Sequence, residues 1–349
     1  MRSFKLVLTT LLLAGTALAQ QQPGFGERVD VNAVLLDAVV TDSRGNQILG
    51  LTKDDFIVTE DGVQQTIDSV DYLSSRQLLT DNEASAPFNV ERSKEQRYFV
   101  FFLDKVPGGS LFGRLASFRR AAVDFIAKEV GADDLVAVVG HDVRLNIYSD
   151  FTTDKRAISR AFDDAMKFSR GISEAPASGP SILRSIDKDR MMAETGTTYQ
   201  ALELLGDGLR PIRARKNLVL VSPLVYERGE EVRGGVLLST SRYYEPMIEA
   251  LNAANVTVFA MNLLQNAPSD PVYHQTLERI ARETNGEYFR YATSFRTPLR
   301  ELAKASGGYY LITYRTERKA GQTGFQRVDV KVKQPELRVK ARAGYAYGG

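Results

Sequence analysis

The feature that most constrains this chain is a regular alternation of strand and helix patterns between Arg97 and Ser306. Short, almost wholly apolar stretches are followed by segments in which apolar residues recur three or four positions apart, the spacing of one helix face. The strand-like stretches are 98–103, 135–139, 143–148, 217–221, 256–263 and 287–291. Because these strands carry few polar positions, we expect a mostly parallel sheet that helices cover on both faces.

The segments on either side of this region follow another pattern. Residues 28–75 and 307–347 alternate apolar and polar side chains with a period of two, which is typical of half-buried strands. Each segment alone is too small to bury a good core. We therefore predict that together they form one β-sandwich domain and that residues 76–96 are a linker. The α/β domain of residues 97–306 is then inserted in the β-domain or flanked by it.

One long segment, residues 168–195, interrupts the alternation. It contains the stretch "SRGISEAPASGPS", which is rich in Ser, Gly and Pro. Such a composition is typical of an exposed loop, and a loop of this length is usually functional or disordered. We expect it to cover part of the binding face.

The first 19 residues have the pattern of a secretory signal peptide. Arg2 and Lys5 come before or within the start of an apolar stretch, and Ala17-Leu18-Ala19 is a small-x-small cleavage site. The chain has no cysteine for lipid attachment, and no later apolar run has the length of a membrane span. We expect a periplasmic or secreted protein that is cut after Ala19.

The charge balance argues against a nucleic-acid partner. The full chain has 45 basic and 43 acidic residues, and loss of Arg2 and Lys5 with the signal leaves it formally neutral. No run of Lys and Arg with interleaved aromatic residues is present. The expected partner is therefore an extracytoplasmic protein or a cell-envelope polymer, and not a nucleic acid.

Three stretches carry a resemblance to a known family. They are "GLTKDDFIVTEDG" at 50–62, "TLERIARETNGEYF" at 276–289, and "YYLITYRT" followed by "KARAGYAY" at the C-terminal end. With the order of the predicted elements, they resemble the bacterial secreted von Willebrand factor type A (vWA) domain proteins of the acidobacterial, VWFA-related type. The resemblance implies a doubly wound, Rossmann-like α/β fold and a binding function, with no reaction.

That fold typically carries a metal-ion-dependent adhesion site at the carboxyl ends of its strands. The pattern is Asp-x-Ser-x-Ser, then a Thr from a second loop and an Asp after a later strand. On this chain Asp104 matches the first Asp. Thr197 resembles the Thr, although its spacing to the following Ala-Leu is one residue shorter than usual. Val106, Gly108 and Pro223 stand where oxygen ligands are required. We therefore predict a degenerate site that does not hold Mg²⁺ tightly.

Three interpretations of Asp104 stay open. The simplest is that its carboxylate caps the helix that begins near Leu111 or bonds loop amides. The second is a weak, water-rich Mg²⁺ site, in which Ser110 partly replaces a missing serine after a shift of the loop. The third is a catalytic role in an envelope hydrolase together with His141 and Asp142.

The sequence favours an interaction protein over an enzyme. His141 and His274 are its only histidines and lack the spacing of a zinc site, no Gly-x-Ser-x-Gly motif is present, and thiol chemistry is excluded. We expect no catalytic residue and no cofactor. The expected partner-binding face comprises Asp104, Lys105, Ser110, His141, Asp142, Thr197, Thr198 and Ser222.

Overall fold

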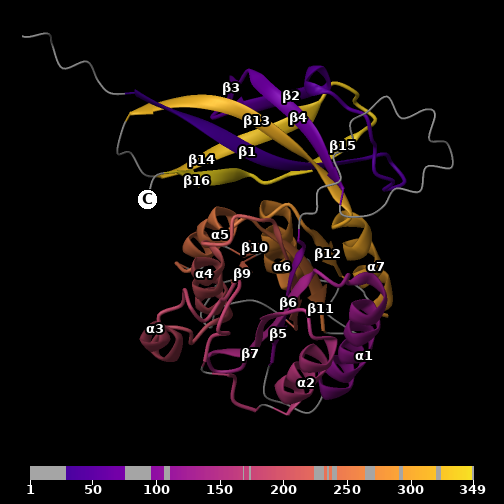
Figure 1. Ribbon diagram of the computed structural model, residues 1–349, viewed down its shortest axis with the longest axis vertical. Coiled ribbons are helices and arrows are strands. Elements are labelled where there is room, and N and C mark those ends of the chain that lie inside the picture. Colours follow the sequence, from indigo (N-terminus) through magenta and orange to yellow (C-terminus); the bar gives the residue numbers. More distant parts are fainter. Residues whose placement is uncertain are drawn as a thin grey trace, which may run out of the picture.

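Two units, one all-β and one α/β, stack on each other in the computed structural model of the chain (Figure 1). The structure describes residues 29–74, 96–105, 111–167, 169–172, 174–223, 232–233, 236–237, 242–263, 272–290, 294–319 and 324–347. The predicted signal peptide, almost all of the predicted linker, and Val106, Gly108 and Ser110 lie outside these residues. Among the described residues, no helix is both long and apolar enough to cross a membrane.

The α/β unit is built on a six-stranded sheet with the order β12-β11-β8-β5-β6-β7. Neighbouring strands run parallel except β7, which runs antiparallel to β6. The strands are β5 (Tyr98–Asp104), β6 (Leu135–His141), β7 (Leu145–Thr152), β8 (Lys216–Ser222), β11 (Val256–Asn262) and β12 (Glu287–Phe289). The predicted mostly parallel sheet is confirmed.

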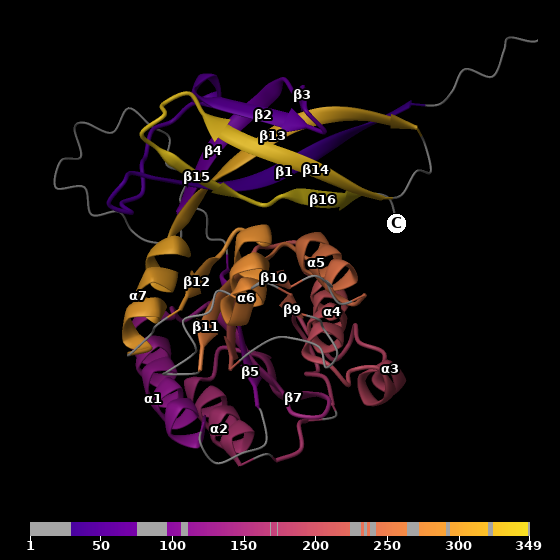
Figure 2. The same cartoon turned by 180° about the vertical axis from the view of Figure 1, so that it is seen from behind.

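Helices cover both faces of this sheet, and each face has its own apolar core (Figures 1 and 2). On β5 the side chains of Tyr98, Val100 and Phe102 enter one core. Those of Phe99, Phe101 and Leu103 enter the other, as the two-residue period of a strand requires. The first core receives α4 (Thr198–Leu209), α5 (Tyr244–Ala253) and α6 (Val272–Glu283). The second receives α1 (Phe112–Glu129), α2 (Lys155–Met166) and α7 (Arg296–Ala305). A short ribbon of β9 (Val232–Arg233) and β10 (Val236–Leu237) completes the unit.

The segment 168–195 differs from its prediction. Ile182, Leu183 and Ile186 are buried in the first core, and α3 (Lys188–Ala193) follows them. The carboxylate of Asp150, which is buried on β7, accepts hydrogen bonds from the Ser181 hydroxyl at 2.7 Å and from two backbone amides, 182 and 183, at 2.9 and 3.1 Å. The expectation of an exposed loop is therefore wrong for the second half of this segment, because three apolar side chains and a buried carboxylate fix it to the sheet.

The all-β unit contains strands from both ends of the chain. One sheet has the order β15-β1-β13-β4 and the other β16-β14-β2-β3. The N-terminal strands are β1 (Val29–Thr41), β2 (Phe56–Glu60), β3 (Val63–Gln64) and β4 (Ile67–Ser74), with the 3-10 turn η1 (Lys53–Asp55) before β2. The C-terminal strands are β13 (Gly308–Lys319), β14 (Gly324–Val332), β15 (Arg338–Ala341) and β16 (Gly344–Tyr347). The central pairs of both sheets, β1 with β13 and β2 with β14, therefore join the two segments.

A buried carboxylate links the two sheets. Glu60, at the end of β2, accepts hydrogen bonds from the Tyr314 hydroxyl at 2.6 Å and the Tyr345 hydroxyl at 3.1 Å. The Thr316 hydroxyl lies 3.3 Å from its other oxygen. Burial, with the bond to Glu60 next in importance, raises the pKa of Tyr314. The tyrosine therefore stays protonated and donates to the carboxylate.

The junction of the units fixes the direction of the parallel strands. Arg215 and Lys216 lie at the amino end of β8. Burial lowers the pKa of both side chains, and the negative charge of Asp37 on β1 acts on both against this effect. The Arg215 guanidinium also lies 5.8 Å from the ring centre of Tyr309 on β13. The amino ends of β5, β6, β8 and β11 therefore face the β-unit, and their carboxyl ends lie at the far side of the molecule.

The fully buried Lys216 predicts an unusual pH dependence of stability. Burial lowers the pKa of Lys216 to about 7, although the charge of Asp37 opposes this shift. Between about pH 7 and the unfolded value of 10.5, the unfolded chain binds a proton that the folded protein does not. The free energy of unfolding therefore rises with pH across this window, by up to about 1.4 kcal/mol per pH unit from this group.

We expect Lys216→Met to lose this rise. Urea unfolding of the wild type and the variant between pH 7 and pH 10 measures it, and substitution of the exposed Lys53 is the matched control. A wild-type slope that persists in Lys216→Met contradicts the prediction.

Candidate functional site

The candidate site lies where three neighbouring strands end. β5 ends at Asp104, and in the sheet register Asp104 lies opposite His141, the last residue of β6. On the other side of β5 lies β8, which ends at Ser222. Parallel strands bring their carboxyl ends to one edge of the sheet, and open α/β folds bind ligands at that edge. The alternation of apolar strands, each ending in a polar residue, therefore places these three side chains together.

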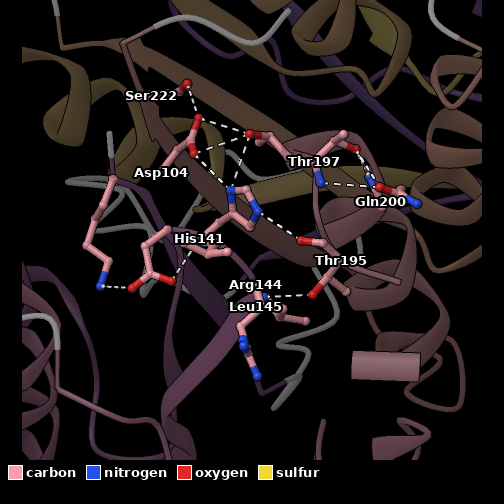
Figure 3. Close-up of polar contacts among 12 residues, drawn as sticks. Asp104, His141, Arg144, Leu145, Thr195, Thr197, Gln200 and Ser222 are labelled. Carbon is pink, nitrogen blue, oxygen red and sulfur yellow. Dashed lines mark hydrogen bonds and ion pairs between the residues drawn. The ribbon is translucent and has the colours of Figure 1, made fainter. Parts of the chain in front are cut away.

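Asp104 is the centre of a hydrogen-bonded cluster (Figure 3). The Ser222 hydroxyl donates to Asp104 Oδ2 at 2.6 Å. The hydroxyl of Thr198 lies 3.2 Å from Oδ1, and Nδ1 of His141 lies 3.3 Å from the same oxygen. We call Asp104, His141, Thr198 and Ser222 the Asp104 cluster. The N-cap residue of α1 is Leu111, whose side chain makes no cap hydrogen bond. The loop amides that Asp104 was expected to bond lie outside the described residues.

The cluster reaches the segment before α4 through His141. Its Nε2 lies 3.0 Å from the carbonyl oxygen of Thr195. The Thr195 hydroxyl donates to the carbonyl of Met191 at 2.8 Å and accepts from the amide of Leu145 at 2.9 Å. Thr195 thus ties the end of α3 to the start of β7. No sequence motif predicted this residue, and a threonine just before a helix start is its only signal.

The two adjacent threonines have different positions. Thr197 is the N-cap of α4, and its side chain forms a capping box with Gln200. Thr198, one residue later, points to Asp104. Thr198 therefore occupies the place next to the carboxylate that the sequence had assigned to Thr197. This placement shortens the spacing to Ala201 by one further residue.

Lys105 and Asp142 form a second, separate contact. Nζ of Lys105 donates to the Tyr148 hydroxyl at 2.6 Å and lies 3.4 Å from Oδ2 of Asp142. Burial lowers the pKa of Lys105, and the negative charge of Asp142 counteracts this in part. Burial would raise the pKa of Asp142, but the amide of Val143 and the charge of Lys105 outweigh it and lower that pKa. The two groups form a partly buried ion pair.

The predicted binding face is mostly buried. Asp104 is 3% exposed, His141 is 5% and Ser222 is 0%, and Lys105 is buried as well. Thr197, Thr198 and Asp142 are half-buried, and Ser110 lies outside the described residues. Of the side chains that the sequence singled out, Asp104, His141, Thr198 and Ser222 are thus bonded to one another, and three of these four are buried.

The donor set does not fit a tightly held Mg²⁺. This ion requires about six oxygens in octahedral geometry, normally with one or two carboxylates. The described residues supply the Asp104 carboxylate, which already accepts hydrogen bonds on both oxygens, and the hydroxyls of Thr198 and Ser222. Pro223 follows β8 and adds no side-chain oxygen. Over the described parts of the chain, no three His, Asp or Glu side chains are grouped to hold a metal ion.

The described contacts do not bring Asp104, His141 and Asp142 together as a hydrolase site would require. Asp142 faces Lys105 and not His141. Both ring nitrogens of His141 already lie at hydrogen-bond distance from oxygens, Nδ1 from Asp104 and Nε2 from Thr195. The Ser222 hydroxyl contacts the carboxylate and not the imidazole. His274 is in the first turn of α6. Among the residues that the structure describes, this arrangement leaves no oriented nucleophile–base pair at the cluster.

Comparison with known proteins gives structural likenesses only. No protein-family model matches the chain, and no curated protein matches it by sequence. A von Willebrand factor type A protein from Catenulispora acidiphila is 9% identical, with a TM-score of 0.40 over 93% of this chain and 75% of that one. The sheet order and the helices on both faces carry the assignment. The α/β unit has a vWA-type fold.

Other solved structures are similar to this chain at a comparable level. The vWF domain of the type V pili tip protein Mfa5 from Porphyromonas gingivalis is 11% identical, with a TM-score of 0.37 over 60% of this chain and 94% of that one. The human COPII-coat protein Sec24c is 9% identical, with a TM-score of 0.40 over 72% of this chain. This chain covers only 44% of Sec24c. These likenesses concern the fold alone.

Proposed function

We propose that this protein is an exported interaction protein whose vWA-type unit binds a protein or cell-envelope polymer at the carboxyl edge of its sheet, without a tightly held metal ion. One observation carries the proposal. At the edge where this fold binds ligands, the carboxylate, the imidazole and both hydroxyls of the Asp104 cluster are bonded to one another, and all but the half-buried Thr198 are buried. Such a cluster fixes the shape of a surface and has no group left for chemistry.

The test is direct binding to envelope material. Purified mature protein is immobilised and exposed to a solubilised envelope fraction, with Mg²⁺ in one series and EDTA in the other. We expect saturable binding of the same components in both series, and no change in their mass on prolonged contact. Asp104→Ala is the variant of the site. Asp329→Asn, an exposed change on β14 in the other unit, is its matched control.

The proposal fails in three distinguishable ways. Binding that appears only with Mg²⁺ restores a metal-dependent adhesion site. Cleavage of a bound component indicates an enzyme. The absence of any saturable binding in both series contradicts an interaction function.

Export is a separate prediction. The basic start, the apolar stretch and Ala17-Leu18-Ala19 predict removal of residues 1–19, which lie outside the described residues. Intact-mass measurement of protein recovered from the periplasm or the medium is expected to give a chain that begins at Gln20. Recovery there of a chain that still begins at Met1 contradicts it.

A further inference from the structure

We propose that the side chains of Val143, Arg144 and Met192 form a binding surface for a partner protein segment that presents a carboxylate beside an apolar side chain. We call these three residues the turn–helix surface, because Val143 and Arg144 lie in the turn between β6 and β7 and Met192 lies on α3. The inference rests on the proposed function and specifies which residues contact the partner and what they recognise.

Two large apolar side chains are exposed at this place. Val143 is 67% exposed and Met192 is 56% exposed. Nη1 of Arg144 lies 3.4 Å from Sδ of Met192, and Val143 precedes Arg144 in the same turn. Single exposed apolar residues are ordinary on protein surfaces. Here an exposed valine is next to Arg144 in the turn after β6, and an exposed methionine of α3 contacts the same arginine.

The charge of Arg144 has no anion among the described residues. The acids of these segments are paired with other cations. Asp142 lies 3.4 Å from Lys105, and Arg190 lies 2.9 Å from Glu194 and 3.2 Å from Asp207. Asp142 is close in sequence, but its carboxylate is engaged by Lys105, the Val143 amide and Asn146. Over the parts of the chain that the structure describes, no ion pair involves Arg144.

Buried hydrogen bonds hold the turn–helix surface in place. The amide of Leu145, next to Arg144, is bound by the Thr195 hydroxyl, which also binds the Met191 carbonyl. Thr195 is in turn held by His141 of the Asp104 cluster. Figure 3 shows Arg144 pointing away from the cluster. The buried cluster therefore fixes the turn relative to α3, and a fixed surface loses less entropy when it binds.

This chemistry selects the class of partner. A planar guanidinium binds a carboxylate through two parallel hydrogen bonds, and the contact is stronger beside apolar groups that exclude water. The exposed methionine adapts its shape to an apolar side chain. An anionic polymer without apolar groups would use Arg144 alone. The combination of both features favours a protein segment with an acidic residue next to an apolar one.

A randomised peptide library is the probe that tests this inference. Peptides are selected on immobilised mature protein and counter-selected on the support without protein. Selected peptides are then synthesised, and their affinities are measured by fluorescence anisotropy. We expect an acidic residue beside an apolar one in the selected sequences. Replacement of that acid by its amide is expected to weaken binding about tenfold, the usual scale for loss of a charged hydrogen-bonded pair.

Variants of the protein give the complementary result. Arg144→Glu is expected to weaken binding by at least about tenfold, and Val143→Ser or Met192→Ser by several-fold. Arg144→Lys, which keeps the charge and loses the planar fork, is expected to lie in between. Arg210→Glu is the matched control, because Arg210 is exposed and lies at the C-terminal end of α4, outside the turn–helix surface. We expect it to leave binding unchanged. Circular dichroism confirms that each variant is folded.

Three outcomes overturn the inference. Selected peptides without an acidic residue do so, as does binding that Arg144→Glu leaves intact. Sensitivity to Arg144→Glu without sensitivity at Val143 and Met192 indicates an anionic polymer instead. In all three, binding of the wild-type protein to the envelope fraction remains a separate readout. If that binding persists, the proposed function stands while this surface is excluded.

Discussion

Truncation of the chain after Ser306 is expected to unfold the N-terminal strands as well. In the described structure, β1 pairs with β13 and β15, and β4 pairs with β13. β2 keeps only the two-residue strand β3 once β14 is removed. An isolated short hairpin is at best marginally stable in water. Loss of residues 307–349 also removes Tyr314 and Tyr345, the partners of the buried Glu60.

The two halves of the molecule give opposite results in this experiment. The α/β unit has its own cores on the two faces of its sheet and is expected to stay folded. Hydrogen exchange of the truncated protein measures both at once. Amides of residues 29–74 are expected to lose their protection, while those of β5, β6 and β8 keep it. Retained protection of residues 29–74 contradicts a core shared by the two ends of the chain.

A second large effect is expected from Asp150→Ala. The buried carboxylate accepts bonds from the Ser181 hydroxyl, from amides 182 and 183, and from the amide of Phe151 at 2.8 Å. Its removal leaves several buried donors without an acceptor, each at about 1–3 kcal/mol. The free energy of unfolding is expected to fall by about 3 kcal/mol or more.

Urea unfolding measures this loss, with Asp133→Ala, an exposed change in the same unit, as the control. Asp150→Asn is expected to cost less than Asp150→Ala, because one carbonyl oxygen still accepts. Hydrogen exchange is expected to show lost protection in the segment around Ile182 and Ile186. A variant within about 0.5 kcal/mol of wild type, the usual range of surface changes, contradicts the anchoring role of Asp150.

The sequence predicted the architecture because its signal is local. A strand such as β5 is apolar at every position before Asp104, and both faces of a covered parallel sheet require that. The position of Asp104, His141 and Ser222 at one edge follows from the same pattern, since each ends a parallel strand. The two-residue period of the flanking segments likewise predicted the β-unit.

Two local signals in the sequence also bear on the structure. Thr197 and Gln200 have the spacing of a capping box, which makes Thr197 a helix cap and leaves Thr198 for the cluster. In the segment 168–195, the apolar positions 182, 183 and 186 have helical spacing and indicated burial, but the Ser, Gly and Pro composition before them masked this signal.

Other features depend on contacts that no local pattern contains. Asp150 binds a segment 31–33 residues further along the chain. Lys216 starts a strand like any surface lysine, and its burial depends on the packing of the β-unit that contains Asp37 against the sheet. Thr195 is recognised only when His141 and Leu145 are placed beside it. Such contacts are set by the tertiary arrangement and require the structure.

The most direct test of the account is a calorimetric titration of mature protein with Mg²⁺ and Mn²⁺. The Asp104 carboxylate is bonded to two hydroxyls and an imidazole, and Pro223 supplies no second carboxylate. We therefore expect no binding heat at micromolar concentrations, for the wild type and for Asp104→Ala alike. Micromolar binding by the wild type that disappears in Asp104→Ala would contradict the account and establish a metal-dependent adhesion site at the sheet edge.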